Sequence, residues 1–166
     1  DAKDYIFMYV TRTQTASANI SRAKIWGWDT SLNYQTKWFN WDLAYNRTRG
    51  KDKSRNGELN AKSGDWLADI SPDTVTSSLD VPLGETGLSA GWVATFAERA
   101  KRVPATYSEQ GGYGVNDFYL SYKGRDRLQG MTTTVVLGNA FDKEYYSPQG
   151  VPQDGRNAKL LVSYQW

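Results

Sequence analysis

Acid and base chemistry in this sequence would have to rest on carboxylates, because its 166 residues include neither His nor Cys. Two acidic pairs, Asp117 with Asp126 and Asp142 with Glu144, could supply a general acid and a general base. A hydrolase of this kind is expected to add a histidine or a recognisable nucleophile arrangement, and the sequence offers neither. We therefore expect no catalytic residues and do not expect an enzyme.

Metal and cofactor binding are restricted for the same reason. Without His and Cys the chain has no imidazole or thiolate ligand. Three carboxylates of one polar segment, Asp52, Glu58 and Asp65, lack the regular ligand spacing of a calcium loop. Tyr and Met are formal haem ligands, but no arrangement of them here supports that role. We expect no metal site and no cofactor in this chain.

The same segment carries Lys51, Lys53 and Arg55 among its carboxylates. These cations could hold an anionic group or a partner protein, or they could simply be a solvated charge run, and the sequence leaves both readings open. The whole chain has 20 Lys and Arg against 18 Asp and Glu, and its cations are scattered. That balance does not predict nucleic-acid binding.

Alternation of apolar and polar residues is the main structural signal. In the stretch 88–96, Leu88, Trp92 and Phe96 share one face, and Ser89 and Thr95 share the other. The same two-residue period predicts about eight strands, at 4–13, 20–35, 38–49, 73–83, 87–102, 113–123, 131–145 and 157–166. Several exceed the usual length of about 5 to 6 residues and are long enough for tilted strands to cross a bilayer.

The connections between these strands alternate in length. Those at 35–37, 84–87 and 124–130 are short, whereas those at 50–72 and 103–112 are long and polar. Short turns at one end and long loops at the other are typical of an outer-membrane barrel. No stretch approaches the roughly 18 apolar residues of a membrane-spanning helix. The sequence thus predicts an all-β, antiparallel, up-and-down transmembrane barrel, with a soluble sandwich or lipocalin-like binder as a weaker alternative.

Aromatic residues make up 14% of the chain. Five tryptophans lie on strands near short turns in this reading, where they favour a girdle at the lipid headgroups over ligand-stacking platforms. They are Trp26, Trp28, Trp38, Trp41 and Trp92. A second set of apolar residues alternates along the last predicted strand and resembles the terminal strand that the outer-membrane assembly machinery recognises. These are Leu160, Val162, Tyr164 and Trp166.

Three segments resemble TonB-dependent outer-membrane receptors. One is the run 23–29, similar to a strand of the form A-x-I-x-G-x-E, and another is 67–72, similar to an L-x-x-I-P-P strand entry. The third lies near the end of the chain and comprises Asn139, Phe141, Asp142, Tyr145, Gly155, Arg156 and Asn157. Within the family, the stretch 45–52 is similar to the haem, haemoglobin and haemophore receptors of the HasR type.

The resemblance implies a receptor barrel of about 22 strands, a plug and a TonB-coupling segment, located in the bacterial outer membrane. With about eight strands, residues 1–166 are expected to be a single barrel domain or segment without a plug. They would form either the C-terminal third of such a barrel or a small closed one, the latter with a purely structural or assembly role. The transported ligand would be haem, delivered with or without a carrier protein. Contacts to a carrier would then involve Lys51, Lys53, Arg55 and Trp66, followed by Arg102 and Tyr107. Lipid or lipopolysaccharide and the barrel assembly machinery are the other expected partners.

Overall fold

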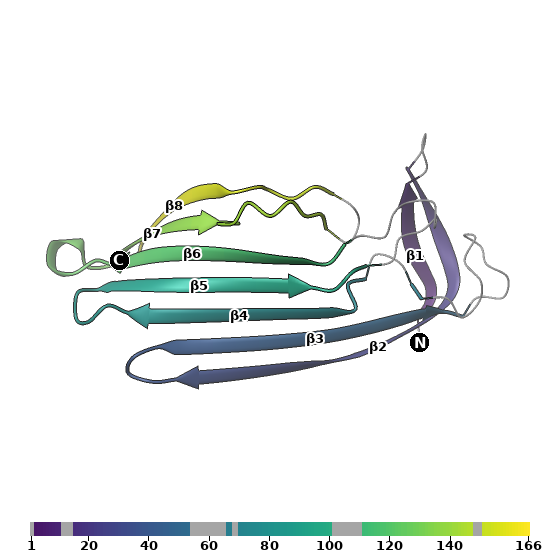
Figure 1. Cartoon of the computed structure of the whole chain (residues 1–166), viewed down its shortest axis with the longest axis horizontal. Coiled ribbons are helices and arrows are strands. Elements are labelled where there is room, and N and C mark those ends of the chain that lie inside the picture. Colours follow the sequence, from purple (N-terminus) through teal and green to yellow (C-terminus); the bar gives the residue numbers. More distant parts are fainter. Residues whose placement is uncertain (1, 11–14, 54–65, 68–69, 101–110, 148–150) are drawn as a thin grey trace.

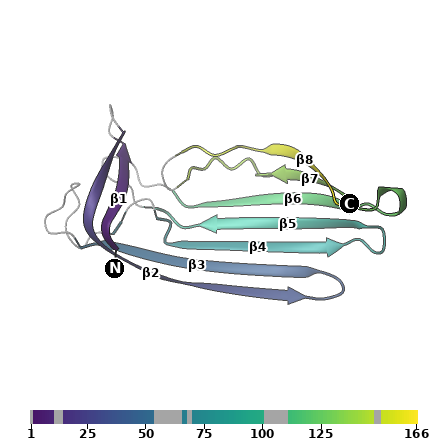
Figure 2. The ribbon, with the colours of Figure 1, turned by 180° about the vertical axis from the view of Figure 1, so that it is seen from behind.

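The structure is a computed structural model that describes residues 2–10, 15–53, 66–67, 70–100, 111–147 and 151–166. Up to residue 21 it describes the backbone alone. These residues form one antiparallel sheet of eight strands in sequence order (Figures 1 and 2). The strands are β1 Ala2–Val10, β2 Thr15–Gln35, β3 Asn40–Asp52, β4 Asp73–Pro82, β5 Leu88–Ala97, β6 Tyr113–Lys123, β7 Met131–Gly138 and β8 Asn157–Tyr164.

Short turns join β2 to β3, β4 to β5 and β6 to β7 at one end of the sheet, which we call the turn end. The Thr36 side chain closes the first by accepting the backbone N–H groups of Trp38 and Phe39. Gly84 and Gly87 give the second its positive φ angles of 64° and 80°. A single 3-10 turn, Asp126–Leu128, lies in the third. The opposite end, with the longer connections, is the loop end.

The expected strands are all present, but several of their boundaries differ. β2 begins at Thr15 rather than near residue 20, and β3 runs from Asn40 to Asp52 rather than over 38–49. β5 ends at Ala97 rather than near residue 102, and β7 ends at Gly138 rather than near 145. β7 stops because Asn139 and Asp142 take positive φ angles of 46° and 54°, which close a turn. β1 ends at Val10, and residues 11–13 of the expected first strand lie outside the described residues.

β2 is long because it pairs with two different strands in succession. Residues 15–23 pair with β1, and residues 23–35 pair with β3. In both ribbon views β1 and the adjoining part of β2 stand at a steep angle to the other strands (Figures 1 and 2). Ala23 lies at this change of direction and is buried.

The sheet is open in the described residues: β1 pairs only with β2, and β8 pairs only with β7. Of the two architectures that the sequence left open, the self-closed small barrel is therefore not the one that the structure adopts. Within the same residues the chain has no helix long and apolar enough to cross a membrane.

Large apolar side chains are not collected in a core. The buried apolar residues of the described chain are mostly small, whereas Leu160, Val162 and Tyr164 are each more than 60% exposed. In a single-layer sheet, alternating residues of each strand point to opposite faces, so the apolar residues gather on one face. That face needs an apolar surrounding.

Candidate functional site

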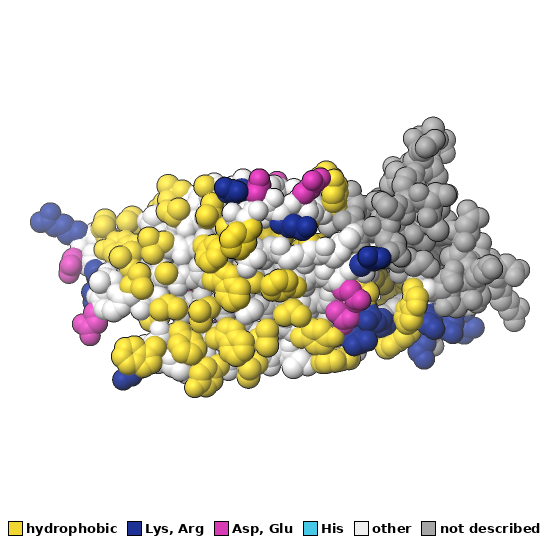
Figure 3. Space-filling view, in the orientation of Figure 1, with side chains coloured by type: hydrophobic (Ala, Val, Ile, Leu, Met, Phe, Trp, Pro, Cys, Tyr) yellow, Lys and Arg dark blue, Asp and Glu magenta, His cyan; other side chains and the backbone are white. Residues whose placement is uncertain are grey.

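Strand register sorts the side chains of β2 to β8 onto two faces. Tyr34, Trp41, Leu79, Trp92, Phe118 and Leu137 form one continuous row across β2 to β7. The rows beside it are also mostly apolar, and we call this side of the sheet the apolar face. Figure 3 shows hydrophobic side chains spread over the middle of the sheet, with charged side chains at both of its ends and along its upper edge. A broad apolar surface of this kind fits the hydrocarbon region of a bilayer.

Two tryptophan side chains on the apolar face are hydrogen-bonded to polar side chains beside them. The indole N–H of Trp41 donates to Ser77 Oγ at 2.9 Å, and the indole N–H of Trp92 donates to Asn116 Oδ1 at 2.9 Å. An unpaired polar group in hydrocarbon costs several kcal/mol, so these pairings make the polar residues compatible with lipid contact. Ser77, the polar interruption of the apolar pattern of β4, is accounted for in this way.

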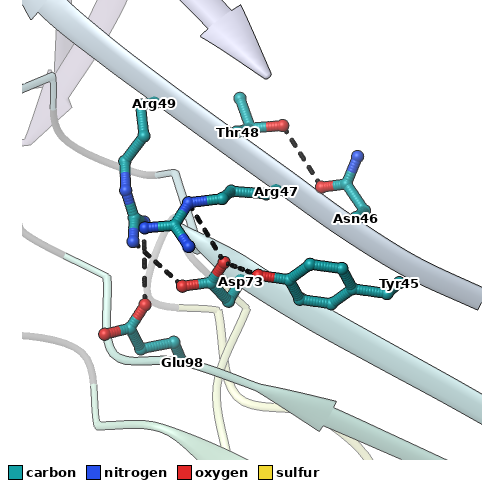
Figure 4. A network of polar contacts seen from close by, with 7 residues as sticks. All are labelled: Tyr45, Asn46, Arg47, Thr48, Arg49, Asp73 and Glu98. Atoms are coloured by element: carbon teal, nitrogen blue, oxygen red, sulfur yellow. Dashed lines mark hydrogen bonds and ion pairs between the residues drawn. The ribbon is translucent and has the colours of Figure 1, made fainter. Parts of the chain in front are cut away.

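A network of charged and polar side chains lies at the loop end of the apolar face (Figure 4). Tyr45, Arg47 and Arg49 alternate along β3 and therefore share a face, and all three contact Asp73, the first residue of β4. Tyr45 donates its hydroxyl to Asp73 Oδ1 at 2.5 Å, and Arg49 Nη2 lies 2.9 Å from Asp73 Oδ2. Arg47 Nε is 3.8 Å from Asp73 Oδ1, and Arg49 Nη1 is 3.6 Å from Glu98 Oε2.

The Asp73 network was not among the expected site residues. The alternation of Tyr45, Arg47 and Arg49 was visible in the sequence, but their acidic partners follow a long connection whose length does not fix the register. The backbone fixes it instead: Thr48 N–H donates to Pro72 O at 2.9 Å, and Glu98 N–H donates to Asp73 O at 2.8 Å. Asp73 therefore joins the ends of β3, β4 and β5.

Aromatic side chains lie beside this network. The Trp28 ring meets the Tyr45 ring edge-on with centroids 4.9 Å apart, and the Trp26 and Trp66 rings are 5.9 Å apart. Lys51 Nζ lies 4.6 Å from the centroid of the Trp66 ring. These contacts place Lys51 and Trp66 on the apolar face, next to the aromatic residues of β2.

A pocket of about 370 Å³ lies between the loop end of β3 and the residues that follow β5. Its charged lining consists of Arg49, Glu98 and Arg99, and its apolar lining includes Trp66 and Leu67. Arg49 Nη1 is buried there and has no hydrogen-bond partner, although Glu98 neutralises it at longer range. The mixed charge suits a small polar group better than a strongly anionic one.

The opposite, polar face carries paired polar side chains. Asn33 Nδ2 donates to Asp42 Oδ1 at 2.6 Å, and Asn46 donates to Asp29. On β6, the Tyr119 hydroxyl donates to Asp80 Oδ1 at 2.7 Å. Side chains of this type suit contact with water or with a polar protein surface, as in the interior of a membrane barrel.

The motif after β7 is a compact loop built around Asn139, which is 3% exposed. Its amide donates to Lys143 O at 2.8 Å and to Asp154 O at 3.2 Å, and its Oδ1 accepts the Lys143 N–H at 2.8 Å. Its own backbone N–H donates to Asp117 Oδ1 at 2.7 Å. The motif is thus a polar clasp that holds the chain between β7 and β8 against β6.

Other motif residues belong to the same clasp. Asp142 Oδ1 accepts the Arg156 backbone N–H at 2.8 Å. Tyr145 stacks at a tilt on Tyr113, with centroids 4.7 Å apart. Burial raises the pKa of the Tyr145 hydroxyl, with a further contribution from Tyr113.

The acidic pairs considered for catalysis are not arranged for it. Asp117 lies within β6 and binds Asn139, whereas Asp126 lies in the turn beyond that strand. Asp142 is engaged by Arg156, and Glu144 accepts the Tyr146 hydroxyl at 2.9 Å. Across the part of the chain that the structure describes, no cluster of three or more acidic residues could hold a metal ion.

Two of the five tryptophans lie away from the short turns where they were expected, and the interface role of all five stays a prediction. Trp38 and Trp41 lie at the turn end, and Trp92 lies within β5. Trp26 and Trp28, however, pair with Arg49 and Arg47 at the loop end of β3, so they are not near a short turn. The long β2 strand carries them away from the turn that follows it.

The other expected residues are placed only in part. Leu160, Val162 and Tyr164 alternate on the apolar face of β8, and the Tyr164 and Trp166 rings are 6.4 Å apart. Lys53 follows β3 and is exposed. Arg55, Arg102 and Tyr107 lie outside the described residues.

Comparison with known proteins adds the family. Residues 1–140 match the family model described as "TonB dependent receptor-like, beta-barrel". The chain is 57% identical over 179 aligned positions to a "Hemin receptor" of Yersinia enterocolitica, covering all of this chain and 25% of that protein. It is 58% identical to a "Hemin receptor" of Yersinia pestis, covering 99% of this chain and 23% of that one. The chain therefore spans about a quarter of the length of these curated relatives.

Solved structures show the same fold at low identity. The copper transporter OprC aligns with a TM-score of 0.76 and 20% identity, over 99% of this chain and 27% of that one. The FrpB iron transporter from Neisseria meningitidis aligns with a TM-score of 0.70 and 19% identity, over 98% of this chain and 27% of that one. At such identities the likeness concerns the strand arrangement alone.

Proposed function

The chain belongs to the TonB-dependent receptor-like β-barrel family of the bacterial outer membrane, and from this membership we propose that it builds part of the wall of a haem-uptake receptor. The proposal that haem is the transported ligand rests on the 57% identity, along the whole chain, to a protein named as a hemin receptor. The apolar face would contact lipid, and the polar face would contact the receptor interior. Both expectations follow from the barrel pattern of apolar-out and polar-in residues.

Haem would be cargo in this receptor and not a resident cofactor of these strands. No histidine is present in the sequence to ligate its iron. Residues outside these 166 would supply any axial histidine and the surface that engages TonB. The role of this chain would be to hold the wall, the loop-end surface and the strand edges in place while haem passes through the receptor.

A haem-carrier protein would meet the receptor at its loop end. Among the residues expected there, Lys51 and Trp66 pack on the apolar face. We therefore assign the carrier contact to Lys53, Arg55, Arg102 and Tyr107, among which Arg and Tyr are common interface anchors. Replacing these four residues by Ala should weaken carrier binding and leave uptake of free haem intact. Equal loss of both would count against the assignment.

The test of haem uptake is growth on haem as the iron source. A strain that lacks the protein should fail to grow on haem, and a plasmid copy should restore growth. Growth on an iron chelate imported by another receptor serves as the control. If loss of the protein impairs the control equally, or leaves growth on haem unchanged, haem is not the cargo.

β8 and the residues that follow it would form the strand that the assembly machinery recognises. β8 is an edge strand in the described residues, and Trp166 is fully exposed. Replacing Trp166 by Ser should lower the amount of heat-modifiable receptor in outer membranes several-fold. Replacing Trp166 by Phe should preserve it, and equal levels for the two variants would argue against this role.

A further inference from the structure

The cations at the loop end of β2 and β3 lie on the apolar face, beside its aromatic residues. Register places Lys24 opposite Lys51. The next pair on the same face, one step toward the turn end, is Trp26 with Arg49. Lys53 N–H donates to Arg22 O at 2.8 Å, so the ladder continues by one more pair of cations. Moving along either strand toward the loop end, the apolar face changes from aromatic to basic.

The aromatic contacts confirm which face these lysines occupy. Trp28 packs on Tyr45, and Trp66 packs on Trp26. Lys51 Nζ then lies 4.6 Å from the Trp66 ring centroid. Because tryptophan and tyrosine favour the headgroup level of a bilayer, a lysine immediately beyond them lies where lipid phosphates lie.

The neighbouring arginines, Arg47 and Arg49, are paired with carboxylates. Asp73 binds Arg47 and Arg49, and Glu98 binds Arg49. In the described part of the chain, no carboxylate lies within ion-pair distance of Lys24 or Lys51. Asp52, the nearest carboxylate along the chain, alternates onto the polar face and is buried. Lys24 and Lys51 therefore keep their positive charge without an acidic partner among the described residues.

We propose that Lys24 and Lys51, next to Trp26 and Trp66, bind phosphate groups of lipopolysaccharide in the outer leaflet of the membrane. The inference rests on the proposed placement of the receptor wall, with the loop end outward. The aromatic rings would contact the glycolipid body and the ammonium groups its phosphates. The pocket beside Arg49 is a poorer phosphate site because Glu98 lines it.

A matched control lies at the turn end. Lys37 Nζ lies 4.6 Å from the Trp38 ring centroid, the same lysine and tryptophan geometry as at Lys51. Arg125 is an exposed cation in another turn at that end. Lipopolysaccharide occupies only the outer leaflet, so the pair Lys37→Gln and Arg125→Gln removes the same charge from the opposite end.

The test is the lipopolysaccharide that co-purifies with the intact receptor from outer membranes, measured by native mass spectrometry in mild detergent. Lys24→Gln with Lys51→Gln should weaken retention by about 25-fold, or about fivefold for each cation removed near the surface. The control pair should retain wild-type amounts. Enzymatic removal of the lipid phosphates should weaken wild-type retention to the level of the variant. Inorganic phosphate at millimolar concentration should not compete.

Several outcomes would overturn the proposal. One is unchanged lipopolysaccharide retention in the Lys24 and Lys51 variant. The others are an equal loss of lipopolysaccharide in the control pair, and wild-type retention that does not change when the lipid phosphates are removed. Loss of carrier-protein binding with unchanged lipid would assign the lysines to a protein partner instead. Lys24→Arg with Lys51→Arg should retain lipid and shows whether a loss reflects charge or folding. Haem-dependent growth is measured on the same strains, so failure of haem uptake is distinguishable from failure of lipid binding.

Discussion

Asp73 is the residue on which the loop end of the sheet depends most. It accepts the Tyr45 hydroxyl and lies within ion-pair distance of two arginines, and its side chain is 25% exposed. Exposed ion pairs contribute little, but charge-assisted hydrogen bonds with limited exposure contribute more. One carboxylate here accepts hydrogen bonds from Tyr45 and Arg49 and forms an ion pair with Arg47, three alternating positions of β3.

Replacing Asp73 by Asn should lower the free energy of unfolding by about 1 to 3 kcal/mol, because two guanidinium groups lose their counter-charge. The measurement is urea-induced loss of heat-modifiable gel mobility in the purified receptor. Asp126→Asn is the matched control, since Asp126 is exposed in a turn and its φ of 51° suits Asn. Equal effects of the two substitutions would contradict the role assigned to Asp73.

Asn139 combines a left-handed backbone with a buried side-chain amide. Replacing it by Gly in one variant and by Ala in another separates these two contributions. Asn139→Gly keeps the positive φ but removes the side-chain hydrogen bonds to Lys143 and Asp154. We expect a loss of about 2 kcal/mol for Gly and about 1 kcal/mol more for Ala, which adds backbone strain. Hydrogen exchange of the amides in 139–157 should show the clasp opening, whereas a wild-type exchange pattern in the Gly variant would show that the hydrogen bonds are dispensable.

At the scale of the strands, alternation predicts the two faces and the number of elements well. The short turns fix the register of their hairpins, because a two-residue period leaves few registers that keep the apolar residues on one side. The end of β7 was missed since Asn139 and Asp142 look polar in either a strand or a turn. Only their positive φ values reveal the turn.

The Asp73 network and the contact between Lys51 and Trp66 were not predictable in the same way. Both depend on where the chain returns to β3 after the long connection that begins beyond Lys53. An isolated bridge between Lys51 and Trp66 sets that position. A charge pattern in the sequence indicates a polar segment, but it does not say which face of the sheet the segment covers.

Gly91 shows how two neighbouring strands fit on the polar face. A Cβ atom built at Gly91 would lie 1.9 Å from Cζ of Tyr119, the ring that reaches over β5 to bind Asp80. Gly91→Ala should therefore displace the ring and cost about 1 kcal/mol, the value of the Tyr119 to Asp80 hydrogen bond. Gly111→Ala, where a Cβ meets nothing within 4 Å, is the control.

A double-mutant cycle in chemical unfolding tests this fit. In a Tyr119→Ala background the cost of Gly91→Ala should vanish, because the ring with which the methyl group collides is absent. A cost that persists unchanged would assign it to the backbone of β5 and not to the contact between the strands.

At the scale of the whole molecule, the open sheet leaves two edges. The described parts of β1 and β8 each pair on one side only. In lipid each unpaired backbone group costs several kcal/mol, so an open edge is tolerated only where another strand covers it. In the proposed receptor, further wall strands would cover both edges.

The 166-residue chain on its own should therefore fail to form a stable monomer in detergent. We expect β-rich species that associate through their edges, seen as multimers in light scattering and as gel bands whose mobility does not change on boiling. The receptor with all its strands should give a heat-modifiable monomer under the same conditions. A monodisperse, heat-modifiable monomer of the short chain would mean that β8 pairs with β1 and that eight strands suffice to close a barrel. That result would favour a self-standing structural role over a segment of receptor wall.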